Sequence, residues 1–261
     1  MSLTIISIAL MVVGLVGIIV CQKKQKTNPN AQALAFVFLI VILAGADVMI
    51  YDTFTGDDRL AAQMQANELT YRKSTSNAIA EYAGKSWNGA KVVIITKPKV
   101  DGTDKTFIET LQADLKNAGL NVAAVEALNV PQPANPEEVP EMEFVDAKYF
   151  NEIFNKYNDA AIFVITASLP QDKQLGELKC WKGFDPKKQC IILTDAESLD
   201  RKVAKAGFHK GVLAALVATN PKYQPTEEVK AAPSDPKAAF AERYILITKD
   251  NYKENDGFFA Q

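Results

Sequence analysis

Residues 91–127 read KVVIITKPKVDGTDKTFIETLQADLKNAGLNVAAVEA, and this stretch decides the class of fold. It opens with Val92–Ile95, a run of β-branched residues that is typical of a strand. Asp104–Ala118 follows, with apolar residues at helical spacing, an N-cap expected at its first residue and Gly119 just past its end. Val122–Val125 is a second short apolar run. The stretch therefore predicts a strand, a helix and another strand in succession.

The same alternation continues toward the C-terminus. Thr194 and Glu197 have the spacing of a capping box, for a helix that runs to Ala206 and ends at Gly207. Two proline-rich passages predict long surface loops. These loops are Pro131–Pro140 and Pro221–Pro236, and the other predicted elements are helices at Asp146–Tyr157 and near Ala238 and strands at Ala161–Ile165, Cys190–Leu193, Val212–Val217 and Tyr244–Ile247.

The predicted strands are continuous apolar runs, which is typical of strands buried on both faces. Helices separate most of them, and the simplest arrangement is a mostly parallel sheet with helices on both sides. We therefore predict one three-layer α/β domain. In architecture it resembles flavodoxin-like folds or one lobe of a periplasmic binding protein, and this resemblance extends to the fold alone.

Two apolar stretches near the start, Leu3–Val20 and Ala31–Tyr51, predict a helical hairpin in a membrane. The first has eighteen residues without a charge, about 27 Å of helix. A thin apolar stripe from Asp57 to about Gly84 predicts a further helix, either a stalk or a helix with one face on the domain. The expected segments are a membrane helix over residues 1–22, a basic cytoplasmic loop over 23–30, a second membrane helix over 31–51, a juxtamembrane helix over 52–86 and the α/β domain over 87–261.

The connector between the apolar stretches carries Lys23, Lys24 and Lys26 and no acidic residue. Basic residues in short loops stay on the cytoplasmic side. We therefore expect a two-pass protein of the cytoplasmic (inner) membrane, in contact with the lipid bilayer, with its C-terminal domain on the extracytoplasmic or periplasmic side. A cleaved signal peptide is the alternative, but it would carry positive charge before the first apolar run and a small-x-small site after it.

Small residues in the apolar stretches could let membrane helices approach closely, and Gly14, Gly17 and Gly45 are the candidates. The plainer interpretation is that glycine is common in membrane helices. Asp47 is ionisable, and such residues within membrane helices are functional candidates. It lies four residues before Tyr51, so a solvated position near the interface or a contact with a partner helix also fits.

Polar residues follow the predicted strands, at the sheet edge where ligands bind in parallel sheets. Such a rim of hydroxyls and carboxylates could bind a small polar solute or a divalent cation. The alternative is turn chemistry, because threonine is favoured at strand ends and helix caps. The candidate ligand residues are Thr96, Lys97, Asp101, Thr166, Thr194 and Asp195, and the same pattern recurs at Lys99, Asp104, Ser168, Thr219 and Thr248–Asp250.

Cys180 and Cys190 fall in the part of the chain that we place outside the cytoplasm, where disulfides form. A disulfide between them would close a short loop and could stabilise the domain by about 3 kcal/mol. Two buried free thiols are the alternative, since cysteine is often a small buried hydrophobe.

No arrangement of catalytic residues is recognisable, and we expect no enzymatic activity, no cofactor and no metal. His209 is the only histidine, which excludes a multi-histidine metal site. No G-x-G-x-x-G motif follows the first strand, so the dinucleotide fingerprint is absent. The formal net charge of −2 creates no global attraction for nucleic acid, and we expect none as a partner.

We expect a non-enzymatic scaffold or accessory subunit of a membrane protein complex, whose partners are other subunits or further copies of the chain. Two membrane helices exceed what a tether needs, and the proline-rich loops suit contacts with partners. Lys179–Lys188 mixes lysines with aromatic residues and forms either a partner contact or a loop that tucks Trp181 into the domain. The alternative function is a tethered solute-binding or sensing domain that uses the carboxyl edge of its sheet.

Overall fold

The computed structural model describes residues 3–25, 30–131, 145–196, 199–224 and 230–255. The chain forms two compact units, Met1–Ala66 and Asn67–Gln261, and each is described by itself. Lys26, Glu197 and most of the first proline-rich passage lie outside the described residues.

Two helices near the N-terminus are long and apolar enough to cross a membrane. The qualifying windows are Ile6–Lys24 and Ala31–Met49, of 19 residues each. Only 17% and 6% of these windows are buried within the protein, so most of their apolar side chains face outward. The two apolar helices agree with those expected from the sequence.

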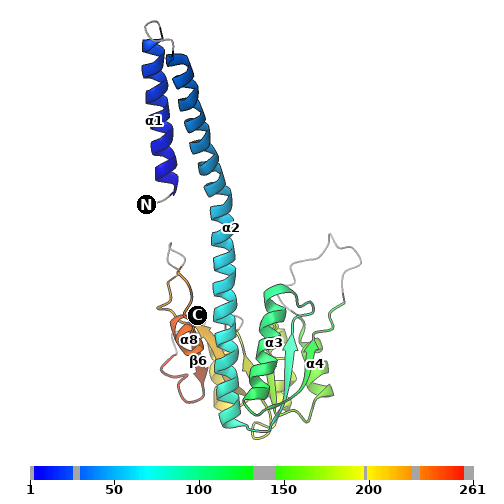
Figure 1. Ribbon diagram of the computed structural model, residues 1–261. Helices are drawn as coiled ribbons and strands as arrows, with labels where there is room; N and C mark the ends of the chain where they lie inside the picture. Colours follow the sequence, from blue (N-terminus) through cyan, green and yellow to red (C-terminus); the bar gives the residue numbers. More distant parts are fainter. Residues whose placement is uncertain (1–2, 26–29, 132–144, 197–198, 225–229, 256–261) are drawn as a thin grey trace. The chain divides into compact units, whose positions relative to one another are not determined.

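The first of these helices extends past the predicted end at residue 22, and the second is much longer than the predicted membrane segment 31–51. α1 spans Leu3–Lys24 and includes two of the connector lysines in its last turn. α2 spans Ala31–Ser86 and is one continuous helix of 56 residues, drawn in blue to cyan in Figure 1. The segments predicted at 31–51 and 52–86 are therefore parts of a single helix.

Glycines lie where α1 and the first part of α2 approach each other. A Cβ built on Gly14 would come within 2.5 Å of Cγ1 of Ile42. A Cβ on Gly17 would come within 2.6 Å of the Phe38 ring, and one on Gly45 would meet the opposite helix at 3.0 Å. The absence of side chains at these three positions permits the close approach.

A six-stranded sheet forms the centre of the second unit, in the order β2-β1-β3-β4-β5-β6. The strands from β2 to β5 pair in parallel, and β6 pairs antiparallel to β5. β1, β3, β4 and β5 are almost wholly buried, as their continuous apolar runs predict. The bounds are β1 Lys91–Thr96, β2 Asn121–Ala127, β3 Ile162–Ile165, β4 Cys190–Leu193, β5 Leu213–Thr219 and β6 Tyr244–Thr248.

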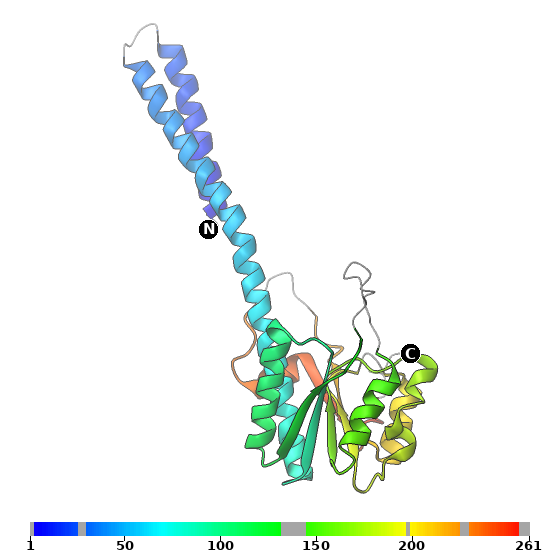
Figure 2. The same cartoon turned by 90° about the vertical axis from the view of Figure 1, so that its right-hand side faces the viewer.

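Helices cover both faces of the sheet, as Figure 2 shows. On one face Ile79 of α2 and Leu111 of α3 pack in one apolar cluster, together with α8. On the other face Phe150 of α4 and Phe208 of α7 pack in a second cluster with α6. The predicted three-layer α/β domain is confirmed. The helix bounds are α3 Gly102–Asn117, α4 Ala147–Lys156, α5 Asp172–Leu175, α6 Lys179–Gly183, α7 Arg201–Lys210 and α8 Pro236–Arg243.

Two predicted N-caps are wrong. The N-cap of α7 is Asp200, whose carboxylate accepts hydrogen bonds from two backbone N–H groups of the first turn, the shorter at 2.6 Å. Thr194 instead donates its hydroxyl hydrogen to the Ile165 carbonyl, at 3.3 Å across the sheet. Asp101 occupies the N-cap position of α3, and Asp104 lies within the first turn. Thr194 and Asp104 each form a hydrogen bond or ion pair with another residue, so neither side chain caps a helix.

The predicted end of α7 is also wrong. Gly207 lies inside the helix and is buried, and a Cβ on it would come within 2.9 Å of Leu213. Gly211 ends the helix with φ of 77°, a left-handed conformation that glycine adopts at little cost. Gly207 is small because β5 packs closely on it.

The disulfide hypothesis is wrong, and its alternative of two buried thiols holds. Cys180 and Cys190 are both free and buried. Cys180 belongs to one apolar cluster and Cys190 to the other, on opposite faces of the sheet. Trp181 packs beside Cys180 on α6, as expected if this basic stretch tucks the ring into the domain.

Candidate functional site

A cavity of about 610 Å³ lies at the carboxyl ends of β1, β3, β4 and β5. Pockets for small molecules fall in the range of ~300–1,000 Å³. Charged, hydroxyl and aromatic side chains line it together. They are Glu68, Arg72 and Thr75 of α2, Lys97, Lys99, Asp104 and Phe107 after β1, Thr166, Ser168, Thr194, Asp195 and Thr219 after β3 to β5, and Arg243 and Tyr244 where α8 meets β6.

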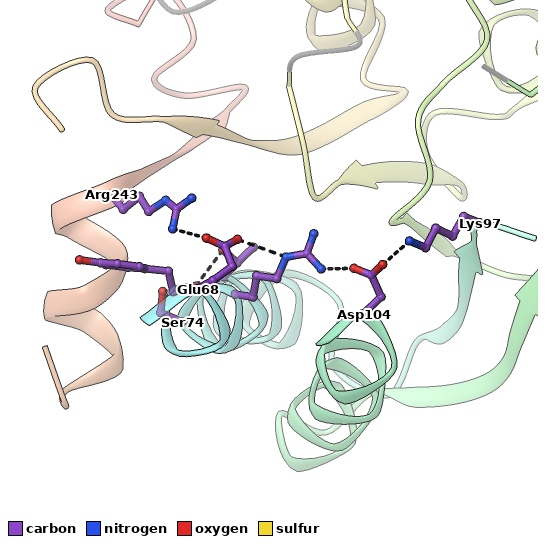
Figure 3. Close-up of polar contacts among 8 residues, drawn as sticks. Glu68, Ser74, Lys97, Asp104 and Arg243 are labelled. Atoms are coloured by element: carbon purple, nitrogen blue, oxygen red, sulfur yellow. Dashed lines mark hydrogen bonds and ion pairs between the residues drawn. The ribbon is translucent and has the colours of Figure 1, made fainter. Parts of the chain in front are cut away.

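A chain of ion pairs crosses the cavity wall (Figure 3). Nη1 of Arg243 donates to Oε2 of Glu68 at 2.5 Å, and Nε of Arg72 lies 3.5 Å from Oε1 of the same carboxylate. Nη1 of Arg72 then donates to Asp104, which also pairs with Lys97. Three cations therefore share two carboxylates, and the chain joins α8, α2, α3 and the loop after β1.

The Asp104 carboxylate connects this series of ion pairs to Lys97, in the loop that follows β1. Burial by itself would raise the pKa of Asp104, but the hydrogen bonds from Lys97 and Arg72 outweigh burial and lower it. The group is therefore ionised at neutral pH. Its two cationic partners explain why it does not serve as a helix cap.

Arg243 is held on the opposite side of the cavity by aromatic rings. Its guanidinium carbon lies 5.0 Å from the ring centre of Tyr71, 5.5 Å from Tyr223 and 5.4 Å from Tyr244, within the range of cation–π contacts. Burial opposes its charge, but Tyr244 and the hydrogen bond to Glu68 raise the pKa of Arg243. The guanidinium is therefore both charged and fixed in position.

The predicted ligand residues divide into two groups. Thr96 is buried, and its hydroxyl donates to the Lys97 carbonyl at 3.1 Å, so it caps the strand end as the alternative interpretation proposed. Asp101 is exposed at the start of α3 and does not line the cavity. The cavity is lined by the other four, Lys97, Thr166, Thr194 and Asp195.

The strand-end pattern fails at β6. Because β6 runs antiparallel, Thr248 pairs with Ala215, and Tyr244 pairs with Thr219 at the cavity edge. The backbone N–H of Thr248 donates to Oδ1 of Asn251 at 2.7 Å, in a local turn at the other edge. Thr248–Asp250 therefore does not line the cavity. Arg243 and Tyr244, at the start of β6, line it instead.

The contribution of α2 and α8 to the cavity is not apparent from the sequence. Glu68 and Arg72 lie far in the sequence from any strand end, and Arg243 directly precedes β6, a strand whose other end was expected at the rim. A signal existed in Glu68 and Arg72, which have the i,i+4 spacing of an ion pair on a helix. Nothing in the sequence shows that this helix face lies on the carboxyl edge of the sheet.

The other candidate groups lie outside the cavity. His209 is exposed in the last turn of α7, and Asp47 is exposed on α2. Within the described residues, no group of three or more His, Cys, Asp or Glu side chains is arranged to hold a metal ion.

No protein-family model and no curated protein matches the chain. Several solved structures do. An arabinose-binding protein from Geobacillus stearothermophilus is 16% identical over 72% of this chain and 63% of its own, with a TM-score of 0.44. A Caulobacter myo-inositol-binding protein is 17% identical over 70% and 60%, with a TM-score of 0.45. A carbohydrate-transporter solute-binding protein from Agrobacterium radiobacter is 15% identical over 75% and 63%, with a TM-score of 0.44.

This chain spans less than two thirds of the length of each of these proteins. At such identities the likeness concerns the fold alone. The α/β domain has a mostly parallel six-stranded sheet, in agreement with the three-layer α/β class that the sequence led us to expect.

Proposed function

We propose that this chain is a membrane-anchored domain that binds a small polar solute, as a solute-binding or sensing protein. The observation that carries the proposal is the cavity of about 610 Å³ at the carboxyl edge of the sheet. A concave rim at Thr96, Thr166 and Thr194 would favour solute binding over a scaffold, and the cavity is lined by Thr166 and Thr194 but not by Thr96. This geometry favours the function that the sequence offered as its alternative.

The proposed role is binding without catalysis. The cavity contains charged groups already paired with one another, an arrangement that positions a ligand through many contacts. His209, the one histidine of the chain, lies outside the cavity and supplies no acid or base there.

Binding can be tested by thermal unfolding of the full-length protein in detergent with a set of small sugars, polyols and organic acids. A ligand at 100 times its Kd stabilises a protein by ~2.7 kcal/mol. For a domain of this size, ~2–4 °C per kcal/mol predicts a rise in Tm of about 5–10 °C. Ser168→Trp, which adds bulk at the exposed cavity rim, should abolish the rise. Asn117→Trp, at the far end of α3, is the matched control. An equal rise in both variants would refute the site.

We also propose that the chain is a two-pass protein of the cytoplasmic membrane, with the connector inside and the α/β domain outside. The two apolar helices and the lysines near their junction support this topology. A membrane-impermeant maleimide should label Lys116→Cys in intact cells and Gln25→Cys only after permeabilisation. The native thiols of the α/β domain are buried and should not interfere. The reverse labelling pattern would contradict the topology.

A scaffold within a membrane complex is the second candidate. The outward-facing apolar side chains of both N-terminal helices favour it, because other membrane helices could cover them as well as lipid. Purification in mild detergent followed by mass spectrometry tests this function. Membrane partners in stoichiometric amounts would support it, and an isolated monomer that binds solutes would leave solute binding as the sole function.

A further inference from the structure

The side chains of the cavity carry an excess of positive charge. Among the residues that the structure describes, four cations line it, Arg72, Lys97, Lys99 and Arg243, against the three carboxylates of Glu68, Asp104 and Asp195. Among the described residues no carboxylate pairs with Lys99, which lies exposed at the rim. A cleft with one uncompensated positive charge attracts an anion and raises its local concentration.

The two arginines are suited to an acidic group. A guanidinium has five N–H donors in a planar fork that matches a carboxylate or a phosphate. The contacts described for Arg72 and Arg243 with Glu68 and Asp104 use a minority of these donors. Aromatic rings hold Arg243 in place, so little side-chain freedom would be lost when an anion binds it.

The threonines offer a different chemistry. The hydroxyl of Thr166 donates to the Ile95 carbonyl at 3.1 Å, and that of Thr194 donates to the Ile165 carbonyl at 3.3 Å. A hydroxyl that has donated its hydrogen still has lone pairs to accept one. Their oxygens are therefore acceptors, and they suit hydroxyl groups on a ligand.

We propose that the ligand of this cavity is a polyhydroxylated acid, with one carboxylate or phosphate near the arginines and lysines and hydroxyls on the threonines. This inference rests on the proposed function and names the class of solute. The acidic group could belong to a free solute, such as a sugar acid or a sugar phosphate, or to a lipid headgroup.

The test compares matched neutral and acidic solutes on the full-length protein in phosphatidylcholine nanodiscs. The pairs are D-glucose and D-glucuronate, D-ribose and ribose phosphate, and glycerol and glycerol phosphate. Calorimetry should show at least one acid binding about tenfold more tightly than its neutral partner. Lys99→Ala should remove most of this preference. Lys116→Ala, an exposed lysine at the far end of α3, should preserve it.

The outcomes separate the inference from the proposed function. Neutral solutes that bind as tightly as their acids would overturn the inference and leave the solute-binding function intact. Binding by none of the solutes, and no stabilisation by phosphatidylglycerol added to the nanodiscs, would overturn both. Stabilisation by phosphatidylglycerol that Lys99→Ala abolishes would support the acidic group and assign it to a lipid.

Discussion

Asp104→Asn should destabilise the α/β domain and at the same time tighten the binding of an acid. The change keeps the shape of the side chain and removes the carboxylate that pairs with Arg72 and Lys97. A hydrogen bond to a charged group contributes ~1.5–3 kcal/mol, and an exposed ion pair ~0.2–1 kcal/mol. The Asp104 side chain is 24% exposed and its partners are 37% and 47% exposed. We therefore expect a loss of about 1–2 kcal/mol.

The affinity for an acid should rise, because removing the carboxylate raises the net charge of the cavity by one. At an effective dielectric constant of ~20, one charge at ~6 Å contributes about 3 kcal/mol, and salt and rearrangement of the freed cations reduce this figure. We expect about half of it, which corresponds to roughly tenfold tighter binding of an acid. A neutral solute should show no such gain.

Urea unfolding in detergent, followed by tryptophan fluorescence, measures the stability, because Trp87 and Trp181 both lie in the α/β unit. Calorimetry with the acids above measures the affinity. Asp159→Asn is the matched control, since Asp159 pairs with Lys91 at 2.7 Å on the surface, outside the cavity. It should leave both the stability and the affinity nearly unaltered, because an exposed ion pair contributes little. Unchanged stability in Asp104→Asn, or weaker binding of acids, would refute this account of the cavity.

The difference in stability between the wild type and Asp104→Asn should depend on pH, because the pKa of Asp104 is lowered in the folded protein. A carboxyl whose pKa is depressed in the folded state stabilises the protein above its unfolded pKa, ~3.9 for aspartate. The contribution is lost as pH falls through the folded pKa. The stability difference between wild type and Asp104→Asn should therefore be complete at neutral pH and shrink below pH ~4. A difference that persists unchanged at lower pH would assign the loss to packing.

Two substitutions and one labelling experiment test the packing. Gly207→Ala should destabilise the domain by about 1–3 kcal/mol, because its Cβ would meet Leu213. Gly211→Ala, at positive φ, should lose about 1–2 kcal/mol, whereas a helix ending at Gly207 would make it neutral. Burial raises the pKa of Cys190 to about 12 and that of Cys180 further, so iodoacetamide at pH 8 should modify neither thiol before urea unfolding. Mass spectrometry detects the adduct, and labelling of the folded domain would contradict their burial.

The strands and the layers of the domain were predictable because their signals are local. A run such as Val92–Ile95 has no polar face, so it must be covered on both sides whatever the rest of the chain does. The apolar stripe of α3, from Phe107 to Leu115, likewise specifies one buried face. The same reasoning placed Thr166 and Thr194 at one edge, because the ends of parallel strands meet there.

The predictions made from the sequence were wrong where one residue type can have two roles. Only the neighbours of the residue in space show which role it has. Glycine ends a helix or admits a close neighbour, and only the position of Leu213 shows that Gly207 does the second. An aspartate near a helix start can cap it or pair with a cation, and Arg72, from another helix, decides the role of Asp104. Cys180 and Cys190 are close in sequence, but their side chains pack in apolar clusters on opposite faces of the sheet.

The sequence by itself determined that this chain has two apolar helices and an α/β domain with buried strands, because hydrophobic burial follows from the spacing of residues along the chain. Only the tertiary structure decided the charge of the cavity. Glu68, Arg72, Asp104 and Arg243 come from three separate helices, and electrostatic attraction acts over distances in space that sequence spacing does not encode. The antiparallel direction of β6, which brings Arg243 to the edge, was decided at the same level.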